Sequence, residues 1–130
     1  MSSWLRACAL LLSPPVLVLF DHGTPKGLAL VLSEHTVHTA QSKGWDRLDN
    51  GALLNAAEEA GFDLVLTTDR RIRYQQNLKA RRIALVVLTG STRWSVVRQH
   101  ADRIAVAVRS AVPGSYAEVE IPYKGKPRRS

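Results

Sequence analysis

Three aspartates stand at positions where their carboxylates could act together. Asp21 follows the apolar run 16–20, Asp69 follows the run 64–66 and two threonines, and Asp49 precedes a segment with helical spacing. Hydrolysis of a phosphodiester requires neutralisation of developing charge and an activated water, and Mg²⁺ or Mn²⁺ supplies both. Because Mg²⁺ needs only one or two carboxylates, with water and phosphate completing its shell, these residues suffice as metal ligands and catalytic groups.

Each aspartate also has an ordinary structural role open to it. Asp21 could start a turn, Asp49 could cap a helix, and Asp69 could cap the segment that follows it. For any one residue the structural and chemical interpretations are about equally good, and only the coincidence of all three favours chemistry. Asp46 and Asp63 are weaker candidates, more typical of a turn and of the start of a strand.

A basic segment, 70–82, follows Asp69 directly and mixes guanidinium, aromatic and amide groups. Arginine suits phosphate, tyrosine suits base stacking, and the placement beside an acidic site favours contact with a nucleic acid. The candidate substrate-binding residues are His22, Arg70, Arg71, Arg73 and Tyr74. A solvated helix face explains the rest of the segment equally well, and a turn explains the histidine at least as well.

Composition points to one globular domain with a polyanionic partner. The chain has 130 residues, 45% of them hydrophobic, and its 18 Lys and Arg against 11 Asp and Glu give a net charge of +7. Such a balance favours a polyanionic partner, although basic surfaces also serve solubility or contact with a membrane surface. Part of the charge lies in the tail 123–130, which is expected to be solvated.

The single cysteine, Cys8, excludes an internal disulfide and any metal site built from several cysteines. It therefore favours a reducing compartment, and we expect a cytoplasmic protein. The apolar run near Cys8 superficially resembles a signal peptide but is short, and no stretch is long enough to span a bilayer. We expect residues 1–15 to form an N-terminal extension and no membrane to be a partner.

Strand-like and helix-like patterns alternate along the rest of the chain. Strands are expected at 16–20, 35–40, 63–68, 82–88 and, as an exposed edge, 116–121. Helices are expected from Thr24-Pro25 through Leu32, from Asp49 to a stop at Gly61 with Glu58 on an exposed face, in part of 70–82, and from Trp94 to a stop at Pro113. This order predicts a single α/β domain, 16–122, with a mostly parallel central sheet and helices on both faces. Asp21 and Asp69 end strands that could be neighbours, and Asp49 opens the helix that leads into the second of these strands. All three aspartates could therefore meet at the carboxyl edge of the sheet.

Three strings carry a resemblance to a known family: Leu19-Phe20-Asp21, the approach from Gly44 to Asp49, and 61–70. They resemble the small PIN-like proteins, a branch of the PIN-domain nucleases that includes VapC-type toxins. The likeness covers about residues 16–88. It implies a PIN-like domain, Mg²⁺- or Mn²⁺-dependent ribonuclease activity, and an acidic cluster formed by the three aspartates. Many members of the superfamily are toxins paired with an antitoxin protein.

The likeness is incomplete at four positions. Where many relatives carry another acidic residue, this chain has His22, Asn50, Gly51 or Arg71. An arginine at such a position lowers metal affinity by like-charge repulsion or serves to bind phosphate. The leading prediction is a metal-dependent endoribonuclease, with the toxin of a toxin–antitoxin pair as one form of it. The alternative is a catalytically weak PIN-like module that binds RNA or a protein, and a homodimer is left open.

Overall fold

The computed structural model describes residues 16–69, 71–72 and 81–122. Within these residues, five strands form one all-parallel sheet in the order β2-β1-β3-β4-β5. The strands are β1 Leu17–Phe20, β2 Thr36–Thr39, β3 Leu64–Thr67, β4 Ala84–Gly90 and β5 Tyr116–Ile121. The prediction of an α/β domain with a parallel sheet is confirmed. The expected extension 1–15, the tail 123–130, Arg70, Arg73 and Tyr74 lie outside the described residues.

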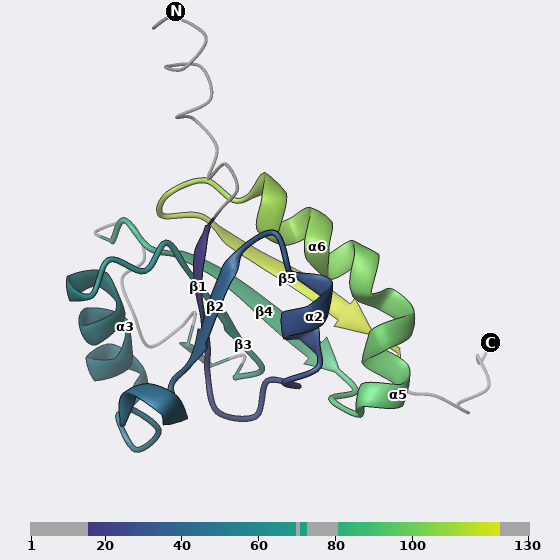
Figure 1. Cartoon of the computed structure of the whole chain (residues 1–130), viewed down its shortest axis with the longest axis horizontal. Coiled ribbons are helices and arrows are strands. Elements are labelled where there is room, and N and C mark those ends of the chain that lie inside the picture. Colours follow the sequence, from purple (N-terminus) through teal and green to yellow (C-terminus); the bar gives the residue numbers. More distant parts are fainter. Residues whose placement is uncertain (1–15, 70, 73–80, 123–130) are drawn as a thin grey trace, which may run out of the picture.

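Helices cover both faces of this sheet (Figure 1). They are α2 Leu28–Val31, α3 Asn50–Glu59, α5 Trp94–Val97 and α6 Ala101–Ser110, with short 3-10 turns η1 Gln41–Lys43 and η3 Arg98–His100. The apolar core is accordingly divided into two clusters: α3 packs on one face, and α2, α5 and α6 pack on the other. None of the helices in the described segments is long and apolar enough to cross a membrane.

Alternation along the strands decides which residues reach which face. Val18 and Leu64 pack with α2, α5 and α6, whereas Leu19 and Val65 pack with α3. Both faces of the central strands are buried, which explains why they appear in the sequence as continuous apolar runs. Asp21 lies two residues after Leu19, so the alternation places its side chain on the same side of the sheet, which faces α3.

The helix expected from Thr24-Pro25 begins later than predicted. The N-cap of α2 is Gly27, with no side-chain hydrogen bond to the helix. Thr24 is buried, and its hydroxyl donates to the carbonyl oxygen of Leu66 at 2.9 Å. The threonine that suggested a cap therefore stabilises the end of β3 instead.

Strand β4 begins two residues later than expected, and Glu58 is the reason. The amides of Arg82 and Ile83 donate to Glu58 Oε2 at 2.8 and 3.2 Å, rather than to a neighbouring strand. Glu58 Oε1 also accepts from Arg81 at 3.2 Å, and the Glu58 side chain is only 20% exposed. The expectation that Glu58 lies on an exposed helix face was wrong, because this carboxylate accepts hydrogen bonds from the residues that precede β4.

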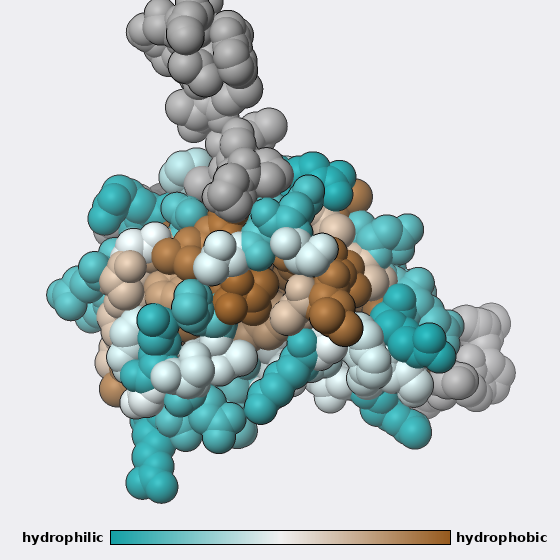
Figure 2. Space-filling view, in the orientation of Figure 1, coloured by the Kyte–Doolittle hydropathy of each residue, from teal (hydrophilic) through white to brown (hydrophobic). Residues whose placement is uncertain are grey.

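Apolar side chains also reach the surface beside α2 and α6. Figure 2 shows them gathered in the middle of the face viewed in Figure 1, with hydrophilic residues around them. Leu30 of α2 is 82% exposed and Val106 of α6 is 52% exposed. Part of the surface of any folded domain is apolar, and nothing in the described residues shows what would cover this face, so it does not indicate a partner.

Candidate functional site

The strand order creates a crevice at the carboxyl ends of β1 and β3. These strands are neighbours, yet the chain leaves β1 toward β2 on one side and leaves β3 toward β4 on the other. Ligands of open α/β sheets bind at such a point, where the direction of the connections reverses. Asp21 follows β1 directly and Asp69 follows β3 by two residues, so both stand at this crevice.

Thr67 connects the two aspartates. Its hydroxyl donates to Asp21 Oδ2 at 2.8 Å and accepts from the backbone amide of Asp69 at 3.1 Å. The Asp21 amide in turn donates to the Leu66 carbonyl at 2.9 Å, which extends the sheet by one residue. Thr67 is fully buried, so one fixed hydroxyl holds the Asp21 carboxylate in relation to the backbone of Asp69.

The carboxylate of Asp69 has further partners. Asn50 Nδ2 donates to Oδ2 at 3.1 Å, and the backbone amide of Arg71 donates to Oδ1 at 2.9 Å. The Arg71 guanidinium adds a longer contact, 3.3 Å from Nε to Oδ1. Partial burial raises the pKa of Asp69, but the hydrogen bonds from Asn50 and Arg71 outweigh it and hold the pKa below its usual value. Asp69 is therefore a carboxylate at neutral pH.

Asp49 takes a different position from the other two aspartates. It is exposed, and its Oδ1 accepts from the Ala52 amide at 2.8 Å, so it caps the N-terminus of α3. In the described part of the chain, no three His, Cys, Asp or Glu side chains are grouped as metal ligands. Asp21 and Asp69, linked through Thr67, are thus the pair on which a site can be built.

The cap predicts different outcomes for two substitutions at Asp49. Asp49→Ala should lower the free energy of unfolding by about 1 kcal/mol, because the Ala52 amide loses its partner. Asp49→Asn should stay close to wild type, since asparagine caps about as well. Urea unfolding followed by circular dichroism measures both. Equal losses in the two variants would mean that charge, and not the cap, is what Asp49 contributes.

Two hollows flank the aspartate pair. One, of about 310 Å³, lies at the carboxyl ends of β1 and β2 and is lined by Asp21, His22 and Lys26, among others. His22 is exposed, and its backbone amide donates to Asp21 Oδ1 at 2.7 Å. The other hollow, of about 420 Å³, lies at the ends of β3 and β4 and includes Asp69 and Arg71. Each hollow therefore places a carboxylate beside a cationic side chain.

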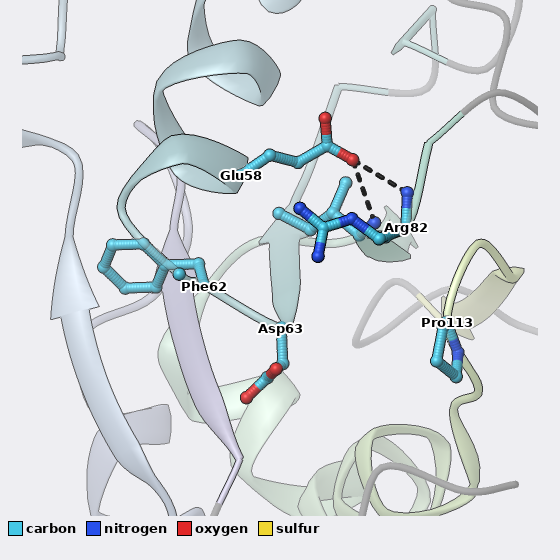
Figure 3. A pocket seen from close by; sticks show the side chains of 7 residues that line it. Glu58, Phe62, Asp63, Arg82 and Pro113 are labelled. Carbon is cyan, nitrogen blue, oxygen red and sulfur yellow. Dashed lines mark hydrogen bonds between the residues drawn. The ribbon is translucent and has the colours of Figure 1, made fainter. Parts of the chain in front are cut away.

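A third pocket, of about 180 Å³, lies at the opposite edge of the sheet (Figure 3). Its lining includes Glu58 of α3, Asp63 just before β3, and Arg82 two residues before β4. The carboxylate of Glu58 is used by the backbone amides described above, and Asp63 Oδ2 accepts from the Leu17 amide at 2.9 Å. These acids hold strand starts in place, as predicted for Asp63, and the pocket is separate from the aspartate pair.

Two residues of the site carried too weak a sequence signal to be identified. Thr67 belongs to an apolar run and looks like an ordinary strand residue, and Asn50 stood out only because relatives often have an acid nearby. Their roles depend on β1 lying beside β3 and on α3 starting near the end of β3.

Comparison of the chain with protein-family models, with curated proteins and with solved structures gave no match.

Proposed function

We propose that this protein is a metal-dependent endoribonuclease in which Asp21 and Asp69 hold one Mg²⁺ or Mn²⁺ ion. The observation that carries the proposal is the hydrogen-bonded series Asp21–Thr67–Asp69 at the crevice between β1 and β3. The resemblance to PIN-like nucleases supports the same reaction. The net charge of +7 agrees with a polyanionic substrate.

The chemistry of the donor set fits such an ion. Hard divalent cations take oxygen ligands, and two carboxylates are enough for magnesium. Thr67 orients Asp21, and Asn50 orients Asp69, as outer partners of metal ligands commonly do. When bound, the ion would offset the charge on the phosphate and increase the nucleophilicity of water.

Cationic side chains on both sides of the pair would hold the RNA backbone. Lys26 belongs to the hollow at β1 and β2, where His22 adds a hydrogen-bonding side chain, and Arg71 belongs to the hollow at β3 and β4. These groups bind phosphate without regard to base sequence. Arg70, Arg73 and Tyr74 remain proposed substrate contacts on the basis of their position in the sequence.

The test is cleavage of single-stranded RNA with controlled metal. Protein stripped with EDTA should be inactive, and Mn²⁺ or Mg²⁺ should restore cleavage. Asp21→Asn, purified in the same way, serves as the control for contaminating nuclease and should lose cleavage. Asp102→Asn, an exposed change on α6, should cleave like wild type. Cleavage that persists in EDTA would contradict the proposal.

A second candidate, an RNA-binding module with little catalysis, is favoured by the state of Asp69. Both of its carboxylate oxygens already accept hydrogen bonds from Asn50 or Arg71. Under this alternative, RNA binding survives EDTA and weakens steeply with salt, because phosphate contacts release counterions. RNA binding that is insensitive to salt would exclude it.

A further inference from the structure

The hollow at the carboxyl ends of β3 and β4 has the groups needed to bind an anion. Its lining includes Arg71 and the threonines Thr68, Thr89 and Thr92. The Thr68 hydroxyl lies against Gly23, which lines the hollow at β1 and β2, so the hydroxyl donors of this hollow are those of Thr89 and Thr92. Neither of these two hydroxyls has a hydrogen-bond partner within the described residues. Two hydroxyl donors beside one guanidinium suit a phosphate.

Arg71 is held to Asp69 in two separable ways. Its backbone amide makes a 2.9 Å bond that fixes the turn after β3. Its guanidinium lies farther away, with Nε 3.3 Å from Oδ1 and an Nη atom 3.5 Å from Oδ2, and the side chain is 77% exposed. Charge-assisted bonds are typically about 2.7–2.9 Å, so the guanidinium contact is weak. The guanidinium can leave Asp69 while the turn stays intact.

We infer that the hollow lined by Thr89, Thr92 and Arg71 binds a phosphate of single-stranded RNA, and that this phosphate draws the Arg71 guanidinium away from Asp69. The inference rests on the proposed function, in which Asp69 is a ligand of the metal ion. The guanidinium and a metal ion compete for the same carboxylate oxygens. When the guanidinium binds a phosphate instead of Asp69, the affinity of Asp69 for the ion therefore rises.

The position of the two hollows favours a polymer over a mononucleotide. Asp21 lines the hollow at β1 and β2, and Asp69 lines the hollow at β3 and β4. An RNA strand that occupies both hollows passes over both carboxylates. One of its phosphates then lies on the Lys26 side and another on the Arg71 side. The substrate would thus help to prepare the metal site at which it is cut.

The first experiment measures Mn²⁺ binding by calorimetry with the full chain. A 2′-O-methyl hexaribonucleotide serves as the RNA strand. Because the proposed nucleophile is water and not a 2′-hydroxyl, electrophoresis after each titration verifies that this oligonucleotide is intact. A saturating concentration of this oligonucleotide should raise the Mn²⁺ affinity of wild type by about fivefold or more. By reciprocity, Mn²⁺ should raise the affinity for the oligonucleotide by the same factor. Arg71→Gln should bind Mn²⁺ more tightly than wild type when the strand is absent, and the strand should add little further affinity.

Arg93→Gln is the matched control. It removes one exposed positive charge beside Thr92, but within the described residues the Arg93 side chain makes no hydrogen bond or ion pair with Asp69. If Arg93→Gln raised Mn²⁺ affinity as much as Arg71→Gln, general repulsion would explain the effect and the inference would be overturned. It would also be overturned by Mn²⁺ binding that depends on Asp69 but responds neither to Arg71→Gln nor to the strand.

The second experiment measures strand binding in EDTA by fluorescence anisotropy. The double variant Thr89→Val, Thr92→Val keeps the β-branched shape and loses two hydroxyls, so strand affinity should fall about tenfold or more. Unchanged affinity in this variant would reject the phosphate site whatever the metal does. A fall in strand affinity without any Mn²⁺ binding by wild type would instead reject the proposed function and keep the phosphate site.

Discussion

Asp21→Asn is expected to lower metal-dependent RNA cleavage by at least about 100-fold, because even an outer partner of a metal ligand contributes about 10- to 100-fold. Asparagine has nearly the shape of aspartate; its amide oxygen can accept from the His22 backbone amide, and its amide nitrogen can donate to the Thr67 hydroxyl. The fold should therefore persist, and loss of activity would report on the lost charge. The measurement is cleavage of a labelled RNA under single-turnover conditions in Mn²⁺.

The control for Asp21→Asn is Asp102→Asn, which removes a carboxylate of the same size from the exposed surface of α6. This control variant should cleave at the wild-type rate. Unfolding of all three proteins in urea shows whether the substitution has altered stability. Equal cleavage by wild type and Asp21→Asn would eliminate Asp21 as a metal ligand.

Gly90→Ala is expected to cause the largest loss of stability from a single methyl group. Gly90 has a φ of +87°, which disfavours any side chain, and a Cβ there would clash with the carbonyl oxygen of Ile121 on β5. Backbone strain and overpacking together should lower the free energy of unfolding by about 2–5 kcal/mol. Chemical unfolding followed by circular dichroism measures the difference.

Gly61→Ala separates the two causes. Gly61 has almost the same φ, +88°, but a Cβ there would meet nothing within 4 Å. Its substitution should cost only the backbone term, about 1–2 kcal/mol. If the two variants lost the same stability, the close approach of Ile121 to Gly90 would not contribute.

Most of the fold could be predicted because strand burial leaves a direct mark on the sequence. Residues 16–20 and 64–66 are continuous apolar runs, as strands covered on both faces must be. Asp49 and Gly61 similarly mark the two ends of α3 with a side-chain cap and a left-handed turn. The prediction that Thr24 caps a helix was wrong, because a threonine hydroxyl can bond either to a helix N-terminus or to a strand carbonyl. Which of the two it does depends on β3, which is distant in the sequence.

The site was harder to predict, since it depends on contacts between distant segments. The sequence indicates that Asp21 and Asp69 follow strands, but not that Thr67 joins them or that Asn50 reaches Asp69 across 19 positions. Asp49 matched both a helix cap and a metal ligand by position. In the structure its carboxylate is used by the Ala52 amide.

The central claim is that Asp21 and Asp69 together hold one divalent cation, and Mn²⁺ calorimetry tests it most directly. Wild type should bind one Mn²⁺ ion per chain, and Asp69→Asn and Asp21→Asn should each abolish that binding, while Asp102→Asn should leave it unchanged. Mn²⁺ binding of equal strength in wild type and both site variants, or none in wild type, would contradict the claim.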